Sequence, residues 1–176
     1  VEPGKGVRFG LAAIKGLGEG AVNSIVAART QLGGRIPSLQ ALCEIIDLRI
    51  ANKRVFEALV KGGACDSIGG GASARATMFA SIDAACEHGT RFQRDKDLGQ
   101  AQLFGGSDRQ ASALVTLPEL KNWTEIEQLQ HEKDALGLYW SGHPVDRYAD
   151  ALRSYGAKSV GELSARKAAG DEDANG

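Results

Sequence analysis

Two glycines flank a leucine in the stretch from residue 14 to residue 18, which reads Ile-Lys-Gly-Leu-Gly. Glycine adopts backbone angles that are closed to other residues, and without a side chain it lets a ligand approach the main chain. A helix that begins directly after this loop would direct its free N–H groups and the positive end of its dipole towards such a ligand. Helix starts of this kind bind phosphate. We therefore expect a phosphate contact at Gly16, Leu17 and Gly18, assisted by Lys15.

The elements that position this loop are expected to be two short helices. Residues from Phe9 to Ile14 have helix-like spacing, and a second helix-like run covers Ala21 to Arg29 before Gly33-Gly34. Two helices joined by Gly-x-Gly have the layout of a helix-hairpin-helix DNA-binding unit, in which Leu17 would fill the space between the helices. A glycine-containing turn that joins two helices without a ligand is the alternative, because the signal is short.

A second helix-loop-helix pattern follows, without the paired glycines. Ser38 is a favourable N-cap for a helix over Leu39–Ile46, and Asn52 for a helix over Lys53–Lys61 that ends at Gly62-Gly63. One hairpin buries too little surface to be stable alone, so we expect the two hairpins to pack together as a four-helix core.

Lys53 and Arg54, at the start of the last of these helices, are further candidates for DNA contact. From Lys5 to Lys61 the chain has nine basic and four acidic residues, a net charge of +5, and the remainder carries −6. A basic N-terminal third is typical of a module that faces phosphates. The alternative is that both side chains only form the solvated face of a helix.

Downstream, capping residues and apolar spacing predict further helices and a linker. A helix capped by Ser73 is expected from Ala74 to about His88, ending at Gly89. Residues 90–118 lack an amphipathic period and are interpreted as a mobile linker. Thr124 and Glu127 form a capping box for a helix through about Leu136, with Ile126, Leu129, Ala135 and Leu136 facing inward, and another helix is expected over Val145–Tyr155.

The predicted fold is therefore all-α. We expect a tandem helix-hairpin-helix DNA-binding region at 1–89, the linker at 90–118, a helical segment at 119–164 and a disordered tail at 165–176. The linker contains one short motif, Gln100-Ala101-Gln102-Leu103-Phe104. An exposed Leu-Phe pair in a polar segment lowers solubility, which favours a docking role, with a chance apolar pair as the alternative.

The sequence offers no pattern for catalysis, metal binding or a cofactor. His88, His131 and His143 lie far apart and outside nucleophile or metal motifs. Four acidic residues around His131 are interpreted as the wet face of a helix: Glu125, Glu127, Glu132 and Asp134. Three widely spaced cysteines without a C-x-x-C argue against a zinc site and for a reducing cytosol, and we expect them to be small buried hydrophobes.

No stretch suits a membrane span or a signal peptide, so a cytoplasmic location is expected. The chain opens with Val-Glu-Pro and no Met, which indicates a piece of a longer protein.

Taken together, several stretches resemble the alpha subunit of bacterial DNA polymerase III, the C-family replicative polymerase. They are residues 9–18, 52–64, 99–104, 132–139 and 141–144, in matching order and spacing. The resemblance covers roughly residues 6 to 156. It implies the tandem helix-hairpin-helix domain that touches the backbone of double-stranded DNA, followed by a helical segment that leads towards an OB-fold.

The resemblance also implies an internal motif that binds the beta sliding clamp. In this family the motif reads Gln, two variable residues, Leu or Met, then Phe, which here gives Gln100, Leu103 and Phe104. The family's catalytic carboxylates belong to an upstream palm domain and have no match here. The implied role is a non-catalytic fragment of a DNA-directed DNA polymerase that works with the rest of the holoenzyme. The alternative is a helix-hairpin-helix fragment of a repair protein without a clamp role, which leaves the Gln-x-x-Leu-Phe motif unexplained.

Overall fold

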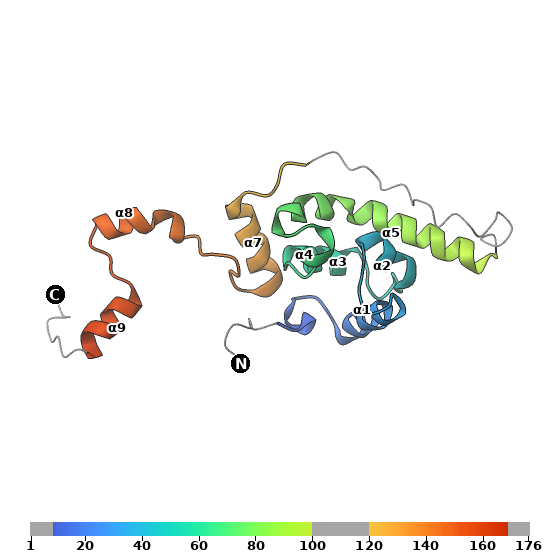
Figure 1. Ribbon diagram of the computed structural model, residues 1–176, viewed down its shortest axis with the longest axis horizontal. Coiled ribbons are helices and arrows are strands. Elements are labelled where there is room, and N and C mark those ends of the chain that lie inside the picture. The colour runs from blue at the N-terminus through green and yellow to red at the C-terminus, as the bar shows by residue number, and fades with distance from the viewer. Residues whose placement is uncertain (1–8, 100–119, 169–176) are drawn as a thin grey trace. The chain divides into compact units, whose positions relative to one another are not determined.

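The computed structural model describes residues 9–99 and 120–168, and all regular elements within them are helices (Figure 1). The chain divides into two compact units, one up to Trp140 and one from Ser141 onwards. The first unit contains η1 (Leu11–Ala13), α1 (Glu19–Gln31), α2 (Leu39–Ile45), α3 (Lys53–Lys61), α4 (Asp66–Gly69), η2 (Ala72–Ala74), α5 (Arg75–Asp97) and α7 (Glu125–Leu136). The second contains η3 (Asp146–Tyr148), α8 (Ala149–Ser154) and α9 (Val160–Ala168). Within the described ranges, no helix combines the length and the apolar character needed to cross a membrane.

The first hairpin differs from its prediction on one side. The expected helix from Phe9 to Ile14 is only the 3-10 turn η1, between Gly10 and Ile14, which are both extended. So short an element cannot recover the cost of helix nucleation, and glycine beside it raises that cost. Helix α1 is longer than predicted and ends as expected, where the Gly34 N–H donates to the Arg29 carbonyl at 2.8 Å.

The second hairpin confirms its predicted caps. The Ala41 N–H donates to the Ser38 hydroxyl at 3.0 Å at the start of α2, and the Asn52 side chain accepts two backbone N–H groups at the start of α3. Phe56 and Val60 of α3 are fully buried, as their helical spacing predicts.

Helix α5 corrects two predictions. It is not capped by Ser73, because the 3-10 turn η2 leads directly into it, and it does not end at Gly89 but continues to Asp97. Gly89 lies against the Cys43 backbone of α2, where an added Cβ would stand 2.8 Å from the Cβ of Cys43. This glycine allows two helices to approach closely, and the Gln93 amide then donates to the carbonyls of Cys43 and Ile46. Residues 90–97 are thus helical, and the linker predicted from residue 90 cannot begin before the end of α5.

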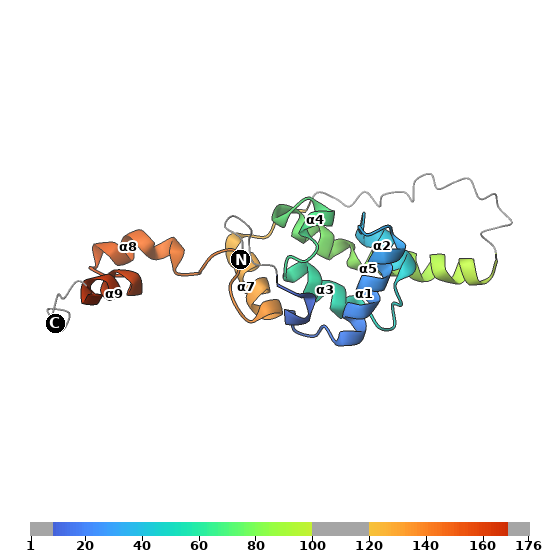
Figure 2. The ribbon, with the colours of Figure 1, turned by 60° about the horizontal axis from the view of Figure 1, so that its bottom comes forward.

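Helices α5 and α7 complete the core of the first unit. Figure 2 shows α3 between α7 and the other helices, α5 packs on α2 and α3, and α7 packs on α3. The predicted capping box of Thr124 and Glu127 is present, and Leu129 and Ala135 are buried as predicted. Ile126 is exposed, contrary to prediction. Because α7 belongs to the first unit, the segment predicted at 119–164 is shared between two units.

The second unit is a short helical chain. The helix predicted over Val145–Tyr155 is the turn η3 followed by α8, and Gly156 ends it with a positive φ of 79°. Ser159 and Glu162 exchange capping hydrogen bonds of 2.8 and 3.1 Å at the start of α9. This helix extends to Ala168, so residues 165–168, predicted as part of a disordered tail, are helical. Predictions for residues 100–119 and 169–176 lie outside the described residues.

Candidate duplex DNA interface

The loop between η1 and α1 contains two glycines, and their backbone conformations differ. Gly16 has a φ of 82°, in the region that favours glycine. Gly18, the N-cap of α1, is extended at φ −73° and ψ 160°, so its backbone does not require glycine and the expectation of unusual angles there is wrong. Leu17 is buried between them, as predicted. A Cβ added at either glycine would meet no atom within 4 Å, so both are open to an approaching group.

Backbone hydrogen bonds decide which N–H groups of this loop remain available. The Leu17 N–H donates to the Ile14 carbonyl at 3.2 Å, so the phosphate contact predicted there is not open. Among the described residues, no acceptor is found for the backbone N–H groups of Gly16, Gly18, Glu19 and Gly20. These groups stand at the start of a 13-residue helix, where a helix dipole favours an anion. The N–H groups that remain available for the predicted phosphate contact are therefore those of Gly16, Gly18 and the first turn of α1.

Lys15 is held at the junction of this loop with α7. Its N–H donates to the Ala135 carbonyl at 2.8 Å. Its side chain runs beside Gly137, where an added Cβ would stand 3.2 Å from the Lys15 ammonium. The ammonium thus lies at the C-terminal end of α7, where a positive charge is favourable. Lys15 is exposed, so it can serve both this helix end and a phosphate near the loop.

The loop before α3 is closed by its own side chains. The Asn52 Oδ1 accepts the N–H groups of Arg54 at 3.0 Å and Val55 at 3.4 Å. The Arg49 guanidinium binds Asp47 at 2.9–3.0 Å, and this hydrogen bonding holds the pKa of Asp47 below its ordinary value. The N–H of Arg54 is thus occupied, whereas those of Asn52 and Lys53 have no acceptor among the described residues.

The two cations predicted at the start of α3 have different surroundings. The Lys53 ammonium lies 2.6–2.8 Å from the carboxylate oxygens of Asp83 on α5, and this hydrogen bond raises the pKa of Lys53. Arg54 is exposed and has no carboxylate partner in the described parts of the chain. Of the pair, only Lys53 has a carboxylate partner among the described residues.

The structure brings the starts of α1 and α3 together. A Cβ added to Gly20, in the first turn of α1, would lie 3.7 Å from the Ile50 side chain in the loop before α3. The open N–H groups of the first hairpin and Arg54 in the first turn of α3 therefore belong to neighbouring helix starts. Gln100, Leu103 and Phe104, predicted for clamp binding, lie outside the described residues and follow soon after the end of α5.

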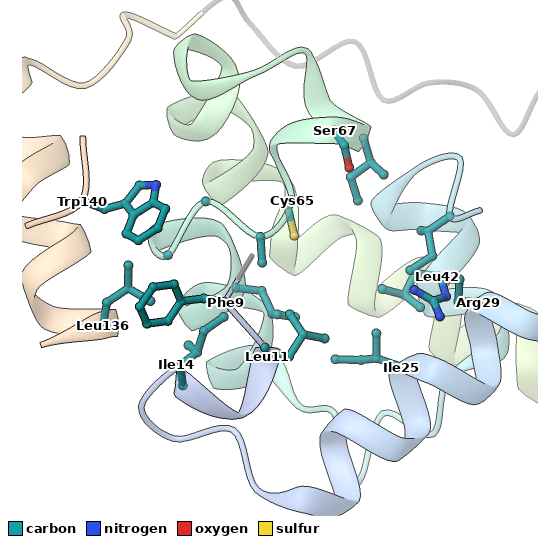
Figure 3. Close-up of a pocket in the computed structure, with 18 of the residues that line it drawn as sticks. Phe9, Leu11, Ile14, Ile25, Arg29, Leu42, Cys65, Ser67, Leu136 and Trp140 are labelled. Carbon is teal, nitrogen blue, oxygen red and sulfur yellow. The ribbon is translucent and has the colours of Figure 1, made fainter. Parts of the chain in front are cut away.

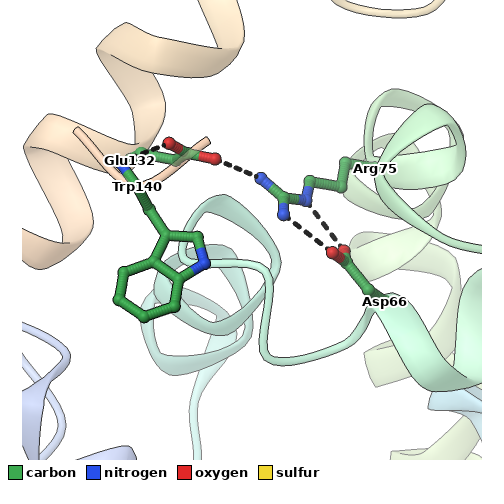
Figure 4. Close-up of polar contacts among 4 residues, drawn as sticks. All are labelled: Asp66, Arg75, Glu132 and Trp140. Atoms are coloured by element: carbon green, nitrogen blue, oxygen red, sulfur yellow. Dashed lines mark hydrogen bonds and ion pairs between the residues drawn. The ribbon is translucent and has the colours of Figure 1, made fainter. Parts of the chain in front are cut away.

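Sequence reasoning missed a buried ionic network that joins three helices (Figure 4). The Arg75 guanidinium donates to both Asp66 oxygens, at 2.8 and 2.7 Å, and to Glu132 at 3.0 Å. The other Glu132 oxygen accepts the backbone N–H of Trp140 at 2.8 Å, and Glu132 is completely buried. Its assignment to a wet helix face is wrong. The signal was present in the spacing, because Glu132 stands three residues after Leu129 and three before Ala135, which both face the core.

The cysteines behave largely as small buried hydrophobes. Cys43 and Cys65 are buried, and Cys86 is half-buried. Burial raises the pKa of Cys65 to about 12, so its thiolate is scarce at neutral pH. In the described parts of the chain, no three His, Cys, Asp or Glu side chains gather as metal ligands.

Comparison with known proteins agrees with this geometry. A model of the helix-hairpin-helix motif matches residues 1–87. DNA polymerase III subunit alpha of Vibrio cholerae is 36% identical over 93% of the chain, that of Pseudomonas aeruginosa 35% over 88%, and that of Neisseria meningitidis 39% over 92%. The chain spans only 14% of the length of each of these proteins. The similarity thus covers one segment of proteins named DNA polymerase III subunit alpha.

Proposed function

We propose that this chain is a non-catalytic segment of a replicative DNA polymerase, which holds the backbone of duplex DNA and attaches the polymerase to the beta sliding clamp. The observation that carries the DNA contact is the open start of α1, with four backbone N–H groups that lack an acceptor among the described residues. Main-chain donors at a helix start recognise a phosphate and carry no information about base sequence.

The strength of this contact follows from the charges around it. Glu19 places a carboxylate in the first turn of α1, and its charge opposes that of a phosphate. The N–H groups alone therefore bind a phosphate weakly, and the exposed cations Lys15 and Arg54 supply the remaining attraction. Because bound phosphates release counterions, the affinity for duplex DNA is expected to fall as salt rises.

A matched pair of glycine variants tests the DNA contact. Gly18→Val places a branched side chain over the open N–H groups, whereas Gly10→Val adds the same group on the other side of η1. Both glycines are extended, at φ −73° and −71°, and neither has an atom within 4 Å of an added Cβ, so both variants should fold.

We expect Gly18→Val to weaken duplex binding on the order of tenfold, the value of one charge-assisted hydrogen bond, while Gly10→Val retains it. Fluorescence anisotropy with two unrelated duplex sequences measures both. Equal losses in the two variants would refute the phosphate site, and a loss for one sequence alone would indicate contacts with bases.

The clamp contact in this proposal rests on the sequence Gln100-Ala101-Gln102-Leu103-Phe104. Leu103 and Phe104 would fill an apolar pocket of the clamp, a burial worth roughly 3–6 kcal/mol, while Gln100 forms hydrogen bonds at the pocket rim. Fixing the peptide in one conformation costs about 2–5 kcal/mol, so the isolated affinity is modest. DNA threaded through the ring makes the attachment multivalent and therefore stronger.

The double variant Leu103→Ala, Phe104→Ala tests this contact, with Gln102→Ala at a variable position of the motif as the control. We expect the double variant to lose binding in a pull-down with a purified sliding clamp, and the control to keep it, with duplex binding unchanged in both. Clamp binding that survives the double change would show that the motif is misassigned. If the unmodified chain does not bind the clamp at all, the alternative of a repair-protein fragment is favoured.

A further inference from the structure

A cavity of about 690 Å³ lies in the first unit, between η1, α1, the turn after α3 and the end of α7 (Figure 3). Its floor is formed by core side chains, among them Ile14, Ile25, Leu42 and Leu59. This volume is typical of sites that bind small molecules or short peptide segments. None of the six residues predicted for DNA contact lines it, so it is a separate feature from the phosphate site.

One end of the cavity carries a positive charge without a counter-charge. Arg29 and Arg35 line it, both are exposed, and neither has a carboxylate partner among the described residues. The lining contains no acidic side chain. Figure 3 shows Arg29 beside Leu42, away from the aromatic residues at the other end. Two guanidinium groups next to an apolar floor favour a ligand that ends in a carboxylate.

The other end is aromatic, and the backbone of Trp140 is anchored to the buried ionic network. Phe9 and Trp140 stack edge to face, with ring centroids 5.1 Å apart and an interplanar angle of 81°, and both rings are more than half exposed. The backbone N–H of Trp140 donates to Glu132, which Arg75 binds in turn. Such an aromatic rim suits a large apolar side chain of a ligand.

We propose that this cavity binds an extended peptide segment of a separate protein, with an apolar side chain between Phe9 and Trp140 and a carboxylate on Arg29 and Arg35. The complementary charge decides the class of ligand. A neutral apolar ligand would leave both guanidinium groups without an anion, and the phosphates of a nucleic acid would leave the apolar floor uncovered. This site lies beyond the proposed DNA and clamp contacts and does not depend on them.

A panel of fluorescein-labelled hexapeptides tests the proposal on the full 176-residue chain. Each peptide carries Leu, Phe or Trp in its first half and ends in either Asp-Asp or Asn-Asn. By fluorescence anisotropy, we expect the acidic peptides to bind on the order of tenfold more tightly than their amide counterparts, the effect of one charge-assisted hydrogen bond. The double variant Arg29→Gln, Arg35→Gln should remove this preference.

Two further variants locate the binding in the cavity. Gly10→Leu fills its mouth from an extended position with open space around the added side chain, and should abolish binding of every peptide. Ala12→Leu, at an exposed neighbour that does not line the cavity, should leave binding intact.

Three results would overturn the proposal. They are equal binding of acidic and amide peptides, absence of binding across the whole panel, and displacement of the peptides by duplex DNA together with lost DNA affinity in the double arginine variant. The last result would assign both arginines to phosphates instead. Because the Gly18 and clamp variants are measured separately, failure here leaves the proposed function standing.

Discussion

The two hairpins share a layout but differ in the residue that caps their second helix. In the first, Gly18 offers no side chain, and the N–H of Gly20 in the first turn of α1 has no acceptor among the described residues. In the second, the Asn52 side chain accepts the equivalent N–H, that of Arg54, together with the N–H of Val55. A helix start can satisfy its donors internally or present them to an anion, but the same donors cannot do both. Under the proposed function, the first hairpin, with no side chain at its N-cap, is expected to bind phosphate more strongly than the second.

Each hairpin is completed by a helix from elsewhere in the chain, and these helices also differ. The first hairpin, whose opening helix is reduced to η1, is closed by α7 through the bond from the Lys15 N–H to the Ala135 carbonyl. The second is closed by α5, through the close contact of Gly89 with Cys43. The loop between η1 and α1 is therefore held by α7, which the buried ion pair of Arg75 and Glu132 joins to α5.

The strongest test of this arrangement is to break that network. Glu132→Ala leaves the Arg75 guanidinium buried with only Asp66 as partner, which should lower the free energy of unfolding by about 3–5 kcal/mol. Urea unfolding measures the loss, and Glu125→Ala on the exposed face of α7 serves as the control. In hydrogen exchange, the Lys15 amide should lose more protection than the Val55 amide. Equal loss at both positions would show that α7 supports the two hairpins alike.

The next test changes the N-cap residue of each of these two helices. Asn52→Ala should lower the free energy of unfolding by about 1 kcal/mol with little change in DNA binding, because the proposed phosphate contact lies on the first hairpin. Gly18→Asn should do the reverse: its side chain can cap α1, adding a few tenths of a kcal/mol to stability while blocking the phosphate. Urea unfolding and anisotropy with a labelled duplex separate the two effects. Loss of DNA binding in Asn52→Ala would place a phosphate on the second hairpin too.

The helix caps were predictable because they depend on residues adjacent in sequence. Ser38, Asn52 and the pair of Thr124 and Glu127 each bond to backbone groups within three residues, so the residue types alone identified the starts of α2, α3 and α7. The position of the loop between η1 and α1 was predictable for the same reason, from Gly16 and Gly18.

Residues whose roles depend on distant partners were misread. Gly89 resembled a helix stop, but its role is set by Cys43 on another helix. Glu132 resembled a solvated side chain, but Arg75, 57 residues earlier, makes it a core residue. The difference between Gly16 and Gly18 could not be predicted either, because glycine is compatible with both backbone conformations.

The cations at the start of α3 offer a finer test of the division of roles. Because Lys53 already binds Asp83, Arg54→Gln should weaken duplex binding more than Lys53→Gln. If Arg54 neutralises one phosphate, its loss should reduce the slope of log affinity against log salt by about one, whereas Lys53→Gln should leave the slope nearly unchanged. Titrations at several salt concentrations measure both slopes. A larger change for Lys53→Gln would mean that Lys53 leaves Asp83 when DNA binds.

The smallest expected effect is a pH dependence at the contact between α7 and the second hairpin. His131 of α7 lies beside Trp123, with ring centroids 4.2 Å apart, and its buried Nδ1 has no hydrogen-bond partner among the described residues. Burial, and then the nearby Lys61 of α3, lower the pKa of His131 below its ordinary value, although Asp134 and Glu127 act in the opposite direction.

A lowered histidine pKa means that the unfolded chain binds the proton more tightly than the folded chain. The stability that the neutral ring contributes is therefore complete above about pH 6.5 and is lost as the pH falls through the folded pKa. We expect the urea midpoint to drop modestly between about pH 7 and pH 5.5, and His131→Gln to reduce this drop. His143→Gln, in the second unit, is the control. A drop that persists unchanged in His131→Gln would place the titrating group elsewhere and leave the contact between α7 and α3 independent of pH.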